Sequence, residues 1–164
     1  MISATTAGFC DLRWQRIPNW LVVITILLSL IWHTAVSGLS GLWMSLAGLL
    51  VGTAVLFPLF MLRGMGAGDV KFFGAVSAAV TFKYVFTLFL ISAVIAALMA
   101  IFRALWGGVL LATVANLFRL IGWFLRGRFR SHPVLNIASG QAIAIPFGVS
   151  VAIAAWIFIL FGKQ

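Results

Sequence analysis

Residues 84–102 are YVFTLFLISAVIAALMAIF, a stretch without a charged side chain. A helix that crosses the ~30 Å hydrocarbon core of a bilayer needs about 17–25 predominantly apolar residues, so this stretch is long enough to span a membrane. Hydrophobic residues make up 64% of the chain and charged residues only 8%. A soluble domain of 164 residues could not bury that much apolar surface. The composition therefore predicts an integral membrane protein built from helices.

Further apolar stretches lie on both sides of this one, separated by polar or turn-forming segments. Residues 1–10 would form a half-span or a truncated first helix, because a helix of that length covers only about 15 Å. We expect a single membrane-embedded domain over residues 1–164, an all-α polytopic helical bundle with about five full spans. The expected spans lie at about 20–36, 42–62, 70–82, 84–102 and 140–161, with the third shorter than the others.

The basic residues indicate how the chain crosses the membrane. The cytoplasmic side of a membrane protein carries an excess of Lys and Arg, and one orientation leaves only Lys83 and Lys163 outside. Val109–Leu125 would break this pattern if it spanned, so an amphipathic helix in the plane of the cytoplasmic surface is expected there. The net charge of +9 is spread between apolar runs, which favours the lipid bilayer over nucleic acid as a partner. These patterns predict a multi-pass membrane protein with most of its basic residues on the cytoplasmic side.

The chain has only two acidic side chains, Asp11 and Asp69. Both fall on the predicted cytoplasmic side, each in a short polar segment beside an apolar stretch. Charge in or near a bilayer is costly, so an acid kept there indicates a functional site, and paired carboxylates can activate water to cleave an amide. Taken singly, each acid has another interpretation. Asp11 could cap a helix or neutralise Arg13, and Asp69 could be the N-cap of the helix that follows it.

Each acid lies in a distinctive motif. The first is Asp11-Leu12-Arg13-Trp14-Gln15-Arg16-Ile17-Pro18-Asn19, in which the proline suits the first turn of the next helix. The second is Gly64-Met65-Gly66-Ala67-Gly68-Asp69-Val70-Lys71. Its alternating glycines permit unusual backbone geometry and leave room for another chain to approach. The spacing fits neither a dinucleotide-binding motif nor a phosphate-binding loop.

Together these motifs resemble the type IV prepilin peptidases, intramembrane aspartic peptidases that carry a Gly-x-Gly-Asp signature. The segment Ala144-Ile145-Pro146-Phe147-Gly148 is similar to a further motif of that family, which precedes the last helix. The resemblance covers essentially the whole chain. It is closest to the small form associated with Flp-type tight-adherence pili, which lacks the methyltransferase domain with four cysteines found in the larger enzymes.

The resemblance implies an aspartic endopeptidase that removes the basic leader of a prepilin at the cytoplasmic membrane face, with Asp11 and Asp69 as the catalytic pair. One carboxyl group would act as the base and the other as the acid, and the sequence does not assign which. No cofactor or metal is expected. The candidate substrate-binding residues are Gly66, Gly68, Lys71, Arg13 and Arg16, although the three basic ones could simply anchor the chain at lipid head groups.

Two other functions stay open. The chain could be a non-enzymatic membrane subunit of a transporter or secretion machine that uses Asp11 and Asp69 as a proton relay or as structural ties. It could also be an intramembrane protease that acts on other substrates. His33 is expected near the outer end of a span, away from both acids. Gly48-x-x-x-Gly52 predicts close helix packing within the chain, with packing between two copies in a homo-oligomer as the alternative.

Overall fold

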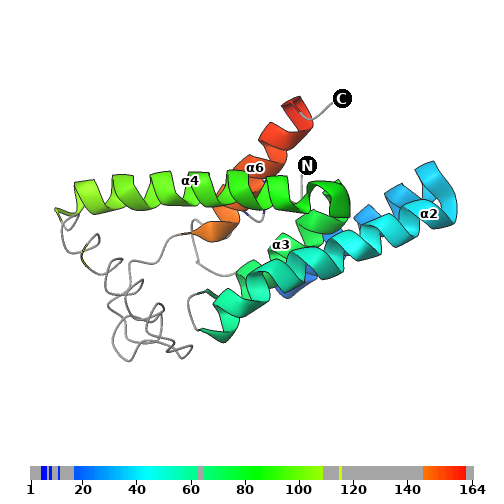
Figure 1. Ribbon diagram of the computed structural model, residues 1–164, viewed down its shortest axis with the longest axis horizontal. Coiled ribbons are helices and arrows are strands. Elements are labelled where there is room, and N and C mark those ends of the chain that lie inside the picture. The colour runs from blue at the N-terminus through cyan, green and yellow to red at the C-terminus, as the bar shows by residue number, and fades with distance from the viewer. Residues whose placement is uncertain are drawn as a thin grey trace.

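The computed structural model describes residues 5, 6, 8, 11, 17–62, 65–108, 115 and 146–161. Within these residues 92% are helical and none lies in a strand, which confirms the predicted all-α class. Apart from Ala115, the predicted in-plane segment Val109–Leu125 lies outside the described residues, as do both arginines of the first motif. The elements are α2 (Asn19–Met61), α3 (Ala67–Val80), the 3-10 helix η1 (Phe82–Tyr84), α4 (Val85–Trp106) and α6 (Phe147–Phe161), as shown in Figure 1.

Helix α2 is a helical hairpin with two arms. Gly38 has φ 61° and ψ −144°, a backbone conformation that is accessible to glycine and that interrupts the helix. The chain turns back there, so the first arm lies beside the second in Figure 1. Val22 of the first arm and Phe57 of the second line the same groove. An unbroken helix of 43 residues would be about 65 Å long, twice the ~30 Å of a hydrocarbon core. The two arms correspond to the predicted spans 20–36 and 42–62.

The α2 helix begins one residue later than the position of Pro18 suggests. Pro18 is the N-cap, with an extended backbone, and its carbonyl oxygen accepts a hydrogen bond of 3.1 Å from the N–H of Leu21. The proline therefore precedes the first turn, and the fixed φ of its ring still directs the chain into the helix.

Helix α3 is the buried centre of the described structure. Phe72 and Phe73 are fully buried, and most residues from Val70 to Val80 are also buried. With 14 residues, α3 is about 21 Å long, shorter than a full crossing of the ~30 Å core. Among the residues that the structure describes, two helices are long and apolar enough to cross a membrane, namely Asn19–Met61 and Phe82–Trp106. The expectation of five full spans therefore stays a prediction.

Small residues bring the second arm of α2 against α3. A Cβ atom at Gly48 would lie 2.5 Å from the carbonyl oxygen of Ser77, and one at Gly52 would overlap the Ser77 side chain. The hydroxyl of Ser45 donates a hydrogen bond of 2.9 Å to the carbonyl oxygen of Ala78. Helix pairs in membranes commonly use such glycines to let two backbones approach. The glycine pair thus packs within the chain, as predicted, and it allows the second half of α3 to approach α2 closely.

Aromatic rings place the start of α6 beside the start of α3. The ring of Phe73, one turn after Asp69, packs against Phe147 at a centroid distance of 6.5 Å and against Phe89 of α4 at 6.3 Å. Tilted and edge-on ring pairs at such distances are favourable. Since Phe147 is the first residue of α6, this packing brings the N-terminus of α6 to the end of α3 that carries Asp69.

Candidate active site

Asp69 lies in the first turn of α3 and is half-buried. Gly66 is the N-cap of this helix, so the alternative that Asp69 is the N-cap is wrong. The aspartate occupies the third helical position, where the backbone N–H of Gly66 hydrogen-bonds its carboxyl group. A carboxylate that reaches back in this way satisfies a backbone donor at the helix start. A Cβ atom at Gly66 would lie 3.3 Å from Oδ2 of Asp69, so the glycine leaves space beside the carboxyl group.

Asp11 is almost fully buried, with 4% of its surface exposed, and it lies against a helix from the other end of the chain. The backbone N–H groups of Gly148 and Val149, in the first turn of α6, hydrogen-bond its carboxyl group. N–H groups in a first turn lack partners within the helix and favour negative charge. Asp11 thus accepts hydrogen bonds at the start of α6, a helix far from it in the sequence. Oδ2 of Asp11 is buried and has no hydrogen-bond partner among the described residues.

Ile17 and Gly148 form the apolar surroundings of this carboxyl group. A Cβ atom at Gly148 would lie 2.9 Å from Oδ2 of Asp11 and 2.9 Å from Cδ1 of Ile17. On the other side of Ile17, a Cβ atom at Gly68 would lie 3.9 Å from its Cβ atom. Ile17 thus lies between the first turn of α3 and the first turn of α6, on the side of Asp11.

Burial and mutual repulsion make the two carboxyl groups harder to ionise. Burial, and to a smaller extent the negative charge of Asp11, raise the pKa of Asp69 to about 6. The hydrogen bond from the Gly66 N–H opposes this rise. Burial also raises the pKa of Asp11, while the N–H groups of Gly148 and Val149 oppose the rise. Neighbouring carboxyl groups that repel each other tend to share one proton. The pair can therefore present one proton donor and one proton acceptor at the same time.

The other candidate residues separate into distinct places. Gly66 and Gly68 lie beside the aspartate pair, whereas Lys71 lines a groove between α3 and α2. Lys71 follows Asp69 by two residues, which places it about 200° around the helix from the carboxyl group. His33 lies at the opposite end of α3, where Nε2 is 2.9 Å from the carbonyl oxygen of Ala79. Of the five candidates for substrate binding, only the two glycines adjoin the pair in the described part of the chain.

Sequence reasoning alone does not single out Ile17, Gly148 or Val149 as part of this site. Two of the three lie in quoted motifs, Ile17 in the segment that ends Ile-Pro-Asn and Gly148 at the end of Ala-Ile-Pro-Phe-Gly. The signal in the second motif is a proline followed by a glycine at a helix start, which is where N–H groups can hold an anion.

A model of the type IV leader peptidase family matches residues 1–101, which include both aspartates. The chain belongs to this family. No curated protein and no solved structure matches the chain. Membership in the leader peptidase family agrees with the apolar helices and makes the chain a membrane peptidase with a protein substrate. In this leader peptidase the N–H groups that bond Asp11 come from α6, beyond the matched residues.

Proposed function

We propose that this leader peptidase is an aspartic endopeptidase that removes the basic leader of Flp-type prepilins at the cytoplasmic face of a bacterial inner membrane. The observation that carries the proposal is the convergence of the chain's only two acidic side chains, Asp11 and Asp69, into one coupled pair. Two carboxyl groups with separate structural roles would not need to be adjacent, because their mutual repulsion makes that arrangement costly. A pair that activates water needs such proximity. Family membership supports a peptide bond as the target.

In the proposed mechanism Asp11 is the base and Asp69 is the acid. The two N–H bonds from α6 stabilise the carboxylate form of Asp11, and the shared proton resides on Asp69. Asp11 takes a proton from water as the oxygen attacks the scissile carbonyl carbon, and Asp69 donates its proton to the carbonyl oxygen. When the tetrahedral intermediate collapses, Asp11 passes its proton to the leaving amine, the C–N bond breaks, and Asp69 regains a proton from the intermediate.

The glycines around Asp69 give the substrate backbone access to the pair. Gly66 is exposed and Gly68 half-buried, and neither has a side chain to obstruct an extended peptide beside the carboxyl group. The prepilin presents a basic leader followed by a hydrophobic helix. In the proposed arrangement the helix lies among the apolar helices of the enzyme while the leader stays in the cytoplasm, so the bond between them meets the pair.

Cleavage of a synthetic prepilin by the full chain in liposomes tests the proposal. We expect one cut, after the glycine that precedes the hydrophobic helix, identified by mass spectrometry of both products. A peptide with the same hydrophobic helix and a neutral leader should be cut poorly, because the proposed specificity includes the basic leader. Equal cleavage of both peptides would favour a protease of broader specificity. A well-inserted chain that cuts neither peptide would favour the proton relay or structural role.

The rate of cleavage should show a bell-shaped dependence on pH. The pair needs one proton: protonation of Asp11 removes the base at low pH, and ionisation of Asp69 removes the acid at high pH. Because the pKa of Asp69 is raised to about 6, the alkaline fall of kcat/KM should be centred near that value in the free enzyme, with a tenfold loss per further pH unit. Rates measured from pH 4 to 9 check this, and a rate that keeps rising above pH 8 contradicts it.

A further inference from the structure

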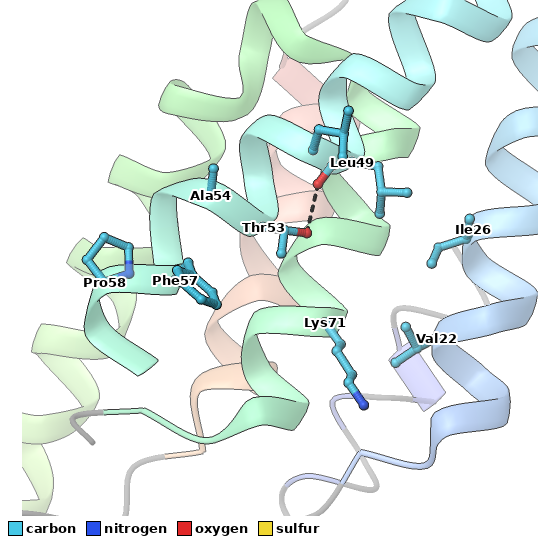
Figure 2. A pocket seen from close by; sticks show the side chains of 9 residues that line it. Val22, Ile26, Leu49, Thr53, Ala54, Phe57, Pro58 and Lys71 are labelled. Carbon is cyan, nitrogen blue, oxygen red and sulfur yellow. Dashed lines mark hydrogen bonds between the residues drawn. The ribbon is translucent and has the colours of Figure 1, made fainter. Parts of the chain in front are cut away.

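An apolar groove separates the two arms of α2 on one side of α3 (Figure 2). Its volume is about 500 Å³. Val22 and Ile26 line it from the first arm, and Ala54 and Phe57 line it from the second. Lys71 of α3 extends toward one end of the groove, next to Val22, and its side chain is exposed. The groove thus combines a long apolar wall with one positive charge at its end.

Among the described residues, Lys71 is the only charged side chain that lines this groove, and the rest of the wall offers little to a polar ligand. Thr53 is the one other lining residue with a polar side chain, but its hydroxyl donates a hydrogen bond of 2.8 Å to the carbonyl oxygen of Leu49 on its own helix (Figure 2). Thr53 therefore presents mainly its methyl group to the groove. A ligand that fills this space needs a hydrocarbon part along the wall and an anionic part at Lys71.

The counter-charge for Lys71 has to come from outside the chain. The sequence has eleven Lys and Arg residues and only two acidic side chains. Both acids belong to the coupled pair, and Lys71 is about 200° around α3 from Asp69. At a membrane surface, the anions available to such a lysine are the phosphate groups of lipids.

We propose that this groove is a specific phospholipid site, with an acyl chain against the apolar wall and an anionic headgroup phosphate on the Lys71 ammonium. The size of the groove favours a lipid over the prepilin helix. One turn of a helix 10 Å wide and 5.4 Å long occupies roughly 420 Å³, so 500 Å³ would hold little more than one turn. A helix in this groove would also lie on the side of α3 away from the Asp69 carboxyl group.

The bound lipid would hold the two arms of α2 together near the aspartate pair. The groove lies toward the ends of the arms, between Val22 and Pro58, and Lys71 is only two residues from Asp69. The hairpin is closed at its other end by Gly38 and tied there to α3 through His33. A lipid with its headgroup on Lys71 would fill the gap that the fold leaves open.

Binding of phosphatidylglycerol and phosphatidylcholine to the full chain, purified in detergent, tests the proposal by native mass spectrometry without any assay of cleavage. We expect one retained phosphatidylglycerol per chain, bound more tightly than phosphatidylcholine, whose choline competes for the phosphate. Lys71→Gln should weaken phosphatidylglycerol binding about fivefold, and Lys71→Arg should preserve it. Lys83→Gln is the matched control, since it removes an exposed lysine at the far end of α3 and should leave binding unchanged.

A second variant tests the acyl part of the site while the charge is kept. Ala54 is exposed in the groove, so Ala54→Trp should fill the space without disturbing the buried core, and it should reduce phosphatidylglycerol binding. Equal binding of the two lipids, or full binding by both Lys71→Gln and Ala54→Trp, would overturn the proposal. So would unchanged lipid binding in Lys71→Gln together with a raised KM for the prepilin, because Lys71 would then serve the substrate.

Discussion

Asp11→Asn and Asp69→Asn should each reduce prepilin cleavage by about 10³-fold or more, because each removes one half of a proton-transfer pair. The double variant should be no worse than either single variant, since residues that act as a unit lose their effect together. Initial rates in liposomes over a long incubation check both statements. Either single variant that retains more than a tenth of the wild-type kcat/KM would contradict the assignment of that aspartate.

The stability of the same variants separates catalytic acids from structural ties. Asn keeps the size of Asp, and its carbonyl oxygen can still accept the N–H bonds from Gly66 or from α6. The pKa values of both acids are higher in the folded chain than in the unfolded chain. Above the pKa of the folded state, ionisation of these acids therefore lowers the free energy of unfolding, and this loss is absent at a pH where the folded and unfolded chains are both protonated. At pH 7.5 the Asn variants should therefore unfold at the same temperature as wild type or at a higher one. A clear fall in the unfolding temperature in detergent would indicate structural ties.

Gly148→Ala should lower kcat by about 10²-fold while the chain still inserts and folds. The added Cβ atom would lie 2.9 Å from Oδ2 of Asp11 and 3.1 Å from its Cγ atom, so the carboxyl group has to move. A displacement of about 1 Å in a catalytic group can cost 10²-fold in rate. Steady-state kinetics with the synthetic prepilin check this, and the pH profile should change as well because the hydrogen bonds to Asp11 change.

Ser150→Ala is the matched control for Gly148→Ala. Ser150 is buried in the same first turns of α6, but its hydroxyl donates a hydrogen bond of 2.7 Å to the carbonyl oxygen of Phe147. Its loss should lower stability slightly and leave the pH profile as it is. If the two variants lose the same activity with unchanged pH profiles, the role of Gly148 is general packing of α6 and not the placement of Asp11.

Hydropathy predicts those parts of the fold that depend on local composition. All of the expected span 84–102 except Tyr84 lies within α4. The gap between the expected spans 20–36 and 42–62 contains Gly38, whose positive φ interrupts α2. The span expected at 70–82 corresponds to α3, although the helix starts at Ala67, three residues before the expected position. These features follow from length, polarity and glycine, which a single sequence displays directly.

Contacts between segments that are distant in the sequence could not be predicted from the sequence alone. The central position of α3 depends on the close approach permitted by Gly48 and Gly52, which a spacing pattern suggests without naming the partner helix. The bond between Asp11 and the first turn of α6 joins opposite ends of the chain. No local propensity encodes such a pairing. The two acids could be identified as candidates because they are rare, but their surroundings required the tertiary structure.

The dependence of Asp11 on α6 has a consequence for biosynthesis. Both aspartates and the helices through Trp106 are synthesised and can enter the membrane before Phe147 leaves the ribosome. Until then the buried carboxyl group lacks the N–H groups of Gly148 and Val149. A chain that stops before Pro146 would carry the complete pair of acids and the whole matched family region, yet it should not cleave. Synthesis of the last helix would then be the step that activates the protease. An incompletely synthesised chain would therefore not cleave other membrane proteins.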